Sequence, residues 1–484
     1  MIEVVIGIDV GTQGARALAV TPAGDVAASA EQRFAPDTRD LPAGWFEQDA
    51  LDWWRAVSAC LRHIVRALPA GAQVAGLSVD STSGTILPVD DNGNPLHPAL
   101  MYNDTRSQPY VTVVRQAGQI IEQKLGYTFG ASFGLPRMVW LAREKPELTP
   151  RTNKLIHATD FIVGRLTGDY GVTNFSDALK SGYDLIAQEW PAFIERELGL
   201  PLSLLPRVTP PGAAIGAVTR AVAEETGLAA GTPVFSGATD GTAAQIASGA
   251  VEPGAWNTSL GTTLVVKGIT EQLLIDPLGR IYSHRHPEGW WMPGGASNTG
   301  AEWIAHECAG RDLQALDAAA EKRLPTHLIR YPLARAGERF PFVHPGATGF
   351  LAGETGGEDE IDRFAAGLEG TALLERLAYD TLQQIGATVG PRVHTTGGGS
   401  RSMVWLKVRA SALDRALVRP AVSETAMGVA LLAAAGAWHG NLSAAAQAMV
   451  RPDIVVEPDS YLEQAYNARY AEFCEQLRQR GYLP

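Results

Sequence analysis

The sequence predicts an α/β protein built of two domains, and three observations support this. The chain has 484 residues, more than a single hydrophobic core usually serves. Short β-branched runs alternate with longer stretches of helical periodicity, as in sheets covered by helices. A strand–Gly-Thr–strand unit occurs at residues 8–20 and again at 258–268. We therefore expect two similar domains, 1–245 and 246–484, facing one another across a cleft.

Periodicity and turn residues predict the elements of the first half. In chain order we expect a β-hairpin over residues 4–20, a helix over 51–68, a strand over 74–80, a hairpin around the Asn-Gly turn at 92–93, helices near 110–125 and 136–144, and a polar loop region over 168–190. The stretch "VFSGATDGTAAQIASG" then ends a buried strand at Phe235 and begins a helix over 242–248. Asp240 lies at the junction.

The second half repeats this pattern. We expect strand, turn and strand over 254–268, then strand, triple-glycine turn and helix over 394–413, a helix over 423–438 capped by Ser423, and a last helix over 461–480. The last helix has five apolar side chains on one face, which we expect to be buried: Leu462, Tyr466, Tyr470, Phe473 and Leu477.

Composition argues against several classes of protein. A formal net charge of -12 disfavours a nucleic-acid partner, whose phosphates require a basic surface. Cys60, Cys308 and Cys474 lack metal-ligand spacing and suit packed thiols in a reducing compartment. The N-terminus lacks a signal-peptide pattern, and no apolar run reaches the roughly 20 residues of a membrane helix. We expect a cytoplasmic protein with no membrane partner, and we leave open whether it forms a homodimer.

Asp240 has two interpretations. A carboxylate before a helix commonly caps the unpaired amides of its first turn. However, Gly237, Ala238, Gly241 and Ala243 leave space around it, and ligands of open α/β sheets bind at such strand-to-helix turns. The local pattern therefore allows either a cap or a group that performs chemistry.

The two Gly-Thr turns are candidates for phosphate binding, because backbone amides can converge there without side chains in the way. Each could equally be an ordinary hairpin turn. Asp9 ends the first strand just before one turn, and burial of its carboxylate is unfavourable unless a cation meets it. Mg²⁺ carried by a nucleotide would be a suitable cation for Asp9. The alternative is that the Asp9 carboxylate accepts hydrogen bonds from the amides of the following loop. The run "TTGGGS" at 395–400 would let a ring or a phosphate approach the backbone.

In this order, "GIDVGTQGARALAV", "GATDGTAA", "NTSLGTT" and "GGGSRSMVWLKVRASAL" resemble the FGGY carbohydrate kinases of the actin-like ATPase superfamily. The resemblance covers essentially the whole chain. "LPRMVWLAREKPE" is similar to one family signature, with Arg137 where lysine is usual. The resemblance implies two actin-like (ribonuclease H-like) ATPase domains, ATP and Mg²⁺ as cofactors, and a small sugar as the substrate.

The resemblance also implies site residues. Asp240 matches the catalytic base, and Asp9 and Asp240 are expected at the Mg²⁺ ion. The expected ATP-binding positions are Asp9, Gly11, Thr12, Gln13 and Gly14 at the first phosphate loop, Gly261, Thr262 and Thr263 at the second, and Gly398, Gly399 and Ser400 at the adenosine turn. The expected sugar-binding positions are Ser83, Asp104 and Asp240, although Asp104 could instead stabilise a turn.

The expected substrate is a ketopentose, D-ribulose or D-xylulose, converted to its 5-phosphate. Typical bacterial xylulokinases carry Met-His-Gly where this chain has Ser81, Thr82 and Ser83. This variant, with "YSHRHPEGWWMPGGASNTG", resembles a D-ribulokinase-like branch. Hydroxyls in place of an imidazole change the hydrogen bonds by which a site distinguishes epimers. Two alternatives stay open: an actin- or chaperone-like ATPase that activates water, and a degenerate kinase that acts as a sugar-responsive regulator.

Overall fold

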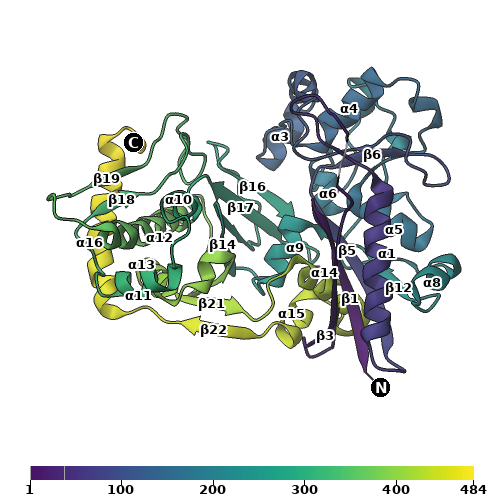
Figure 1. Cartoon of the computed structure of the whole chain (residues 1–484). Coiled ribbons are helices and arrows are strands. Elements are labelled where there is room, and N and C mark those ends of the chain that lie inside the picture. The colour runs from purple at the N-terminus through teal and green to yellow at the C-terminus, as the bar shows by residue number, and fades with distance from the viewer. Residues whose placement is uncertain (1, 37–38) are drawn as a thin grey trace. The chain divides into compact units, whose positions relative to one another are not determined.

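The computed structural model describes residues 2–36 and 39–484, which form two compact units (Figure 1). Unit 1 comprises Met1–Gly249, His284–Trp290 and Val422–Val450, and unit 2 comprises Ala250–Ser283, Trp291–Ala421 and Arg451–Pro484. Both short segments of unit 1 were predicted to lie in the second domain. Mixed α/β sheets in two domains match the predicted fold class.

The segment Val422–Val450 belongs to unit 1 because its helix α14 (Thr425–Ala434) packs on β1 (Glu3–Val10) and α9 (Asp240–Ala247). Two glycines allow this packing. A Cβ atom at Gly7 would lie 1.8 Å from the Ala426 carbonyl oxygen, and one at Gly428 would lie 2.0 Å from that of Ala243. The backbone of α14 therefore lies directly against the backbones of β1 and α9, although these segments are distant in the sequence.

Unit 1 is built on a mixed seven-stranded sheet. Its strand order is β11 (Ala214–Ala217), β12 (Pro233–Phe235), β5 (Gln73–Ser81), β1, β2 (Gly14–Val20) and β3 (Val26–Arg33), with β13 (Ala238–Thr239) also paired to β5. The antiparallel β1–β2 pair confirms the first predicted hairpin. Helix α1 (Ala50–Ala67) buries Trp53, Val57, Leu61 and Ile64 against this sheet, which confirms the predicted amphipathic helix.

Beside this sheet, a four-stranded sheet and several helices complete unit 1. Its strands, in spatial order, are β4 (Glu47–Gln48), β7 (Ala99–Leu100), β6 (Ile86–Val89) and β8 (Lys154–His157), and the helices are α2 (Val111–Ala117), α3 (Gln119–Leu125), α4 (Gly134–Glu144), α5 (Ala158–Thr167) and α8 (Arg220–Thr226). The prediction of a loop over 168–190 was wrong in part, because β9 (Val172–Asn174) and α6 (Phe175–Leu179) lie in this range.

Unit 2 contains the second predicted hairpin, formed by β14 (Trp256–Leu260) and β15 (Leu264–Gly268). The seven-stranded sheet runs β16 (Ile281–Arg285), β17 (Trp291–Ser297), β15, β14, β20 (Arg392–Thr396), β21 (Ala416–Pro420) and β22 (Pro452–Val456). Its main helices are α11 (Leu313–Glu321), α12 (Glu360–Gln384), α13 (Met403–Leu413) and α16 (Ser460–Gln479). Four of the five predicted α16 side chains are buried, and Tyr470 is half-buried.

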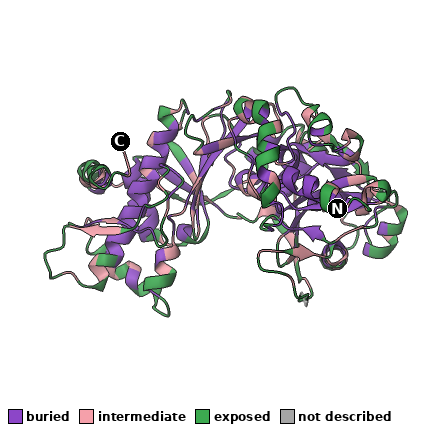
Figure 2. Cartoon of the chain, turned by 90° about the horizontal axis from the view of Figure 1, so that it is seen from above, coloured by how far each residue is buried: buried purple, intermediate pink, exposed green. Residues whose placement is uncertain are grey.

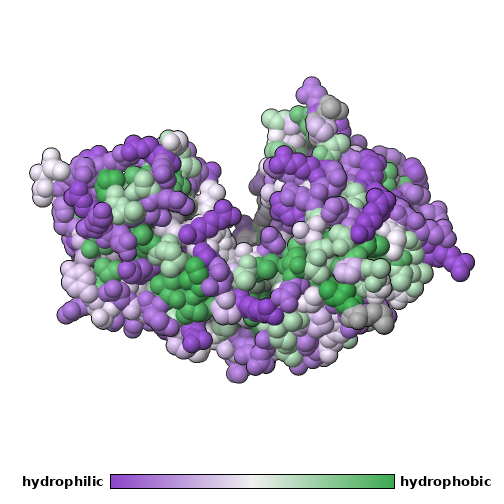
Figure 3. All heavy atoms as spheres, turned by 60° about the horizontal axis from the view of Figure 1, so that its bottom comes forward, coloured by the Kyte–Doolittle hydropathy of each residue, from purple (hydrophilic) through white to green (hydrophobic). Residues whose placement is uncertain are grey.

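The core of each unit lies between its sheet and the helices that cover it (Figure 2). Polar side chains cover most of the face drawn in Figure 3, with smaller apolar areas among them. Cys60, Cys308 and Cys474 are buried free thiols, as predicted. Within residues 2–36 and 39–484, no helix combines the length and apolarity needed to cross a membrane.

Candidate active site

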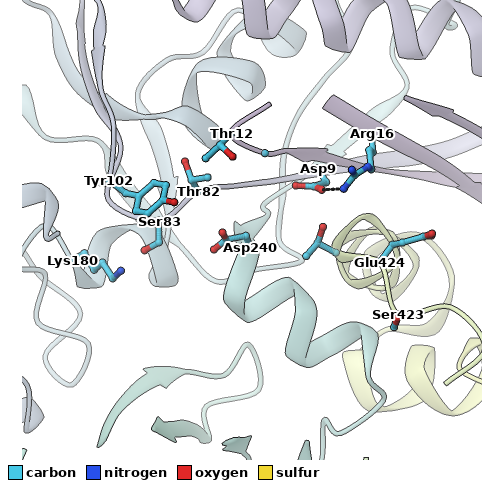
Figure 4. Close-up of a pocket in the computed structure, with 12 residues that line it drawn as sticks. Asp9, Thr12, Arg16, Thr82, Ser83, Tyr102, Lys180, Asp240, Ser423 and Glu424 are labelled. Carbon is cyan, nitrogen blue, oxygen red and sulfur yellow. Dashed lines mark ion pairs between the residues drawn. The ribbon is translucent and has the colours of Figure 1, made fainter. Parts of the chain in front are cut away.

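A pocket of about 580 Å³ lies in unit 1, where β1, β5 and β13 end and α9 begins (Figure 4). It is lined by Asp9, Gly11, Thr12, Arg16, Thr82, Ser83, Tyr102, Lys180, Asp240, Ser423, Glu424 and Thr425. Every one of these residues belongs to unit 1. The fold therefore brings together five predicted site residues from separate parts of the chain: Asp9, Gly11, Thr12, Ser83 and Asp240.

Asp240 is the first residue of α9. Its carboxylate projects into the pocket, toward the side where Thr82 and Ser83 lie (Figure 4). The cap position belongs to Thr239, and the Asp240 Oδ1 atom accepts a hydrogen bond from the Gly241 amide at 2.6 Å. Asp240 is therefore not the cap of the helix, which begins earlier than the predicted residue 242, but it still meets a first-turn amide.

Asp9 is the second-last residue of β1, and its carboxylate lines the pocket. Its partner is Arg16, at 3.9 Å. This guanidinium is 57% exposed, and such pairs contribute little to stability, so the carboxylate stays available to a ligand. The alternative role, binding of loop amides, has no support here, because no amide in residues 2–36 or 39–484 donates to Asp9.

Asp80, an acid that sequence reasoning missed, lies beside Asp9 but does not line the pocket. It stands opposite Asp9 in the register of β5 and β1 and is fully buried. Burial raises the pKa of Asp80 well above its ordinary value, and the negative charge of Asp9 raises it further. Among the described residues no donor reaches its oxygens, and a protonated Asp80 can itself donate to Asp9. An acid near the end of a second apolar strand was the available signal.

The carboxylates of Asp9 and Asp240 fit the Mg²⁺ ion that accompanies a nucleotide. Among the residues that the structure describes, no group of three or more acidic, His or Cys side chains forms a metal cage. Nucleotide-borne Mg²⁺ needs no such cage, because it keeps several waters and binds phosphates together with one or two carboxylates. Two carboxylates lining one pocket meet this requirement.

Hydroxyl and amine groups line the other side of the pocket. The Thr82 hydroxyl bonds that of Thr85 at 2.9 Å, either oxygen being able to donate. The Ser83 Oγ atom has no hydrogen-bond partner within the described part of the chain. Tyr102 and Lys180 lie beside Ser83 (Figure 4). Sequence reasoning missed Lys180, because it follows α6 in a region predicted to be loop.

Asp104 does not line the pocket. Its carboxylate is fully buried, accepts the Phe46 amide at 2.7 Å and the Arg106 amide at 2.9 Å, and pairs with the Arg106 guanidinium at 2.8 Å. These contacts favour the turn-stabilising alternative for Asp104. Arg137, also buried, donates to the carbonyl oxygens of Gly84, Phe133, Tyr102 and Asp104, so it braces the same loops. Desolvation lowers the pKa of Arg137 to about 10.

Gln13 and Gly14 lie in the first hairpin turn but do not line the pocket. Gln13 is exposed, and its carbonyl oxygen accepts the Phe34 amide. A Cβ atom at Gly14 would lie 2.5 Å from the Gln32 carbonyl oxygen, whereas one at Gly11 would make only an ordinary contact, at 3.6 Å from the Gly14 oxygen. Gly14 thus serves the packing of β2 on β3, and Gly11 leaves open space.

The remaining predicted positions belong to unit 2. Gly261, Thr262 and Thr263 form the turn between β14 and β15, and Gly398, Gly399 and Ser400 follow β20. Because β14 and β20 are parallel neighbours, with Ser259 opposite Thr396, both turns lie at the same edge of the sheet. No atom lies within 4 Å of a Cβ built at Gly261 or Gly398. Two predicted loops are thus adjacent, with backbone open to a ligand.

Comparisons with known proteins agree with this arrangement. Residues 4–247 match the N-terminal domain, and residues 256–437 the C-terminal domain, of the FGGY family of carbohydrate kinases. The chain is 31% identical to a xylulose kinase of Streptomyces rubiginosus (89% of this chain, 87% of that one) and 24% identical to a gluconokinase of Bacillus subtilis (89% and 87%). Two crystal structures are similar to this chain over nearly its whole length. A xyloylose kinase from Brucella ovis has a TM-score of 0.89 and 25% identity, and the match covers 99% of this chain and 100% of that one. A xylulose kinase from Rhodospirillum rubrum has a TM-score of 0.87 and 26% identity, and the match covers 98% of each chain.

Proposed function

This chain belongs to the FGGY family of carbohydrate kinases, and from this premise we propose that it phosphorylates a ketopentose with ATP. The preferred substrate is D-ribulose over D-xylulose, and the product is the 5-phosphate. The observation that carries the proposal is the unit 1 pocket, where the Asp240 carboxylate faces the hydroxyl-bearing side chains of Thr82 and Ser83. Relatives named xylulose kinase support a ketopentose substrate.

The side chains of the pocket supply what this reaction needs. A sugar hydroxyl is a weak nucleophile near neutral pH. Asp240 accepts its proton as the oxygen attacks the γ-phosphorus of ATP and ADP leaves, and this general-base step contributes roughly 10²–10⁴-fold. Ser83 and Tyr102 orient the sugar by hydrogen bonds, and the turn amides at Gly11 and Thr12 contact phosphate oxygens. Asp9 and Asp240 would hold the Mg²⁺ that accompanies the nucleotide, and this ion would supply neutralisation of phosphate charge.

A sugar acid is the second candidate substrate. The Lys180 ammonium lies beside Ser83 in the pocket, where it could bind a carboxylate through a charge-assisted hydrogen bond. A relative named gluconokinase supports this candidate. An aldonate such as D-gluconate therefore belongs in any substrate test.

The proposal is tested by measuring ADP release with D-ribulose, D-xylulose, D-gluconate and glycerol, and by locating the phosphate in the product by NMR. We expect D-ribulose to give the highest kcat/KM and a 5-phosphate. Turnover of ATP that needs no sugar would contradict the proposal and favour a chaperone-like ATPase. Binding of ATP and sugar without turnover would favour the sugar-responsive regulator.

A further inference from the structure

We propose that Ser176 is a positioning residue for the reaction, because its hydroxyl fixes the backbone at the start of α9 and thereby the direction of the Asp240 carboxylate. This inference rests on the proposed function, in which Asp240 is the base. Ser176 belongs to α6, the five-residue helix in the region predicted to be loop. It does not line the pocket.

A direct hydrogen bond joins the two elements. The backbone N–H of Thr239, the residue before Asp240, donates to the Ser176 Oγ atom at 2.8 Å, and both residues are buried. The Thr239 hydroxyl donates to the Thr242 hydroxyl at 3.2 Å. The Thr239 side chain caps no amide of α9, and β13 pairs with β5 only through Ala238 and Thr239.

The orientation of the Ser176 hydroxyl is itself fixed. Asn174 caps α6, and its Oδ1 atom accepts from the Ser176 and Asp177 amides at 3.0 Å each and from the Ser176 hydroxyl at 2.6 Å. Since a hydroxyl has one proton, which goes to Asn174, the lone pairs of Ser176 face the Thr239 amide. The Asn174 amide nitrogen bonds Asp177 at 2.7 Å, which fixes Asn174 in turn.

One short helix therefore connects two groups of the pocket. Its first turn holds the backbone that carries Asp240, and it is followed directly by Lys180, which lines the pocket. If the Ser176 hydroxyl is lost, the buried Thr239 amide has no acceptor and the start of α9 shifts to find one. Displacement of a reacting group by about 1 Å can lower a rate by about 10²-fold.

The test compares Ser176→Ala and Ser176→Cys with a control at Ser248, the C-terminal cap of α9. Ser248 is also fully buried, and its hydroxyl donates to the Gln245 carbonyl oxygen at 2.6 Å, so Ser248→Ala removes an equally buried bond away from the pocket. With D-ribulose and ATP, we expect kcat to fall about ten- to hundredfold in both Ser176 variants. The KM for ATP stays near the wild-type value, and the control keeps its kcat.

Hydrogen exchange of the Thr239 amide gives a readout that is independent of activity. This amide should exchange faster in both Ser176 variants and at the wild-type rate in Ser248→Ala. Wild-type kcat in a Ser176 variant whose Thr239 amide exchanges faster would overturn the inference, as would equal kcat losses in Ser176→Ala and Ser248→Ala. Should Ser176→Ala fail to fold, Ser176→Cys decides, since its slightly larger thiol still fills the site and weakens both the bond to Asn174 and the bond from the Thr239 amide.

Asp240→Asn separates this inference from the proposed function. If Asp240→Asn retains turnover, Asp240 is not the base and the proposed function fails. If Asp240→Asn is inactive and the Ser176 variants are fully active, only the positioning role fails.

Discussion

Asp240 shows how the surroundings of a single residue decide its chemistry. It begins a helix whose cap is Thr239, so its carboxylate is left to face the pocket. We predict that Asp240→Asn loses nearly all sugar phosphorylation, while ATP still raises the melting temperature. Because an Asn Oδ1 atom can also accept the Gly241 amide, the variant should melt close to the wild type. Residual kcat above ~10% would exceed what loss of a general base permits.

Ser83 is the residue at which sugar choice can be tested. Its hydroxyl lines the pocket without a protein partner in the described residues, so Ser83→Ala removes no internal bond. D-Ribulose and D-xylulose differ at one hydroxyl, and one rearranged contact is worth ~1–3 kcal/mol, or roughly ten- to two-hundredfold in kcat/KM. We predict that wild type prefers D-ribulose on this scale and that Ser83→Ala erodes the preference with little effect on the KM for ATP.

The matched control for Ser83→Ala is Ser107→Ala. Ser107 also has a buried hydroxyl that lacks a partner in the described chain, and it lies outside the pocket. It should leave the sugar preference unchanged. A tenfold or greater wild-type preference for D-xylulose would instead make the protein a xylulokinase with an unusual pocket.

At the scale of elements, the two Gly-Thr turns can be tested without damage to the fold. A Cβ at Gly261 meets no atom within 4 Å, and one at Gly11 makes only an ordinary contact. We predict that Gly261→Val and Gly11→Val fold normally and raise the KM for ATP far more than the KM for the sugar, because the new side chain keeps phosphates from the turn amides. Unchanged ATP kinetics in Gly261→Val would mean that this turn binds no phosphate.

Gly14→Val is the contrasting variant for this test. Its Cβ would lie 2.5 Å from the Gln32 carbonyl oxygen, so it should lower the melting temperature, unlike the other two variants. Glycines in one hairpin turn thus have different roles, which only the structure distinguishes.

Elements with strong periodicity were predictable from the sequence, and short ones were not. The hairpins β1–β2 and β14–β15 and the helix α1 are confirmed. The five-residue helix α6 is too short to show a period, although Asn174 is a typical cap. Ser423 was predicted to cap α14, but Glu424 occupies that position, because propensity ranks cap residues without locating them to one residue.

At the scale of the whole molecule, long-range contacts determine the features of the site that the sequence did not predict. Asp80 reaches Asp9 through the register of parallel strands. Asp104, predicted to bind sugar, is instead enclosed by Phe46 and Arg106. The return of α14 to unit 1 depends on backbone contacts at Gly7 and Gly428, which no local pattern reveals. Sequence motifs thus identified much of the pocket, and tertiary packing decided which acids line it.

Glu369 makes the stability of the folded chain depend on pH. It is buried in α12 and accepts hydrogen bonds from the Thr326 amide at 3.0 Å and the Tyr466 hydroxyl at 3.1 Å. Desolvation outweighs these bonds and raises its pKa from 4.5 to about 7. Between these values the unfolded chain releases a proton that the folded chain keeps, so the free energy of unfolding falls as pH rises. Below 4.5 this contribution is fully present, and above about 7 it is lost.

Urea unfolding across this pH window tests the role of Glu369. We predict that Glu369→Gln, neutral at every pH, unfolds with a smaller decline in free energy between pH 4.5 and about 7 than the wild type. The matched control is Glu475→Gln, which changes an exposed carboxylate of α16 and should keep the wild-type decline. If Glu369→Gln and wild type declined equally, another group would have to carry the pH dependence, since burial of the Glu369 carboxyl would then leave its pKa near that of the unfolded chain.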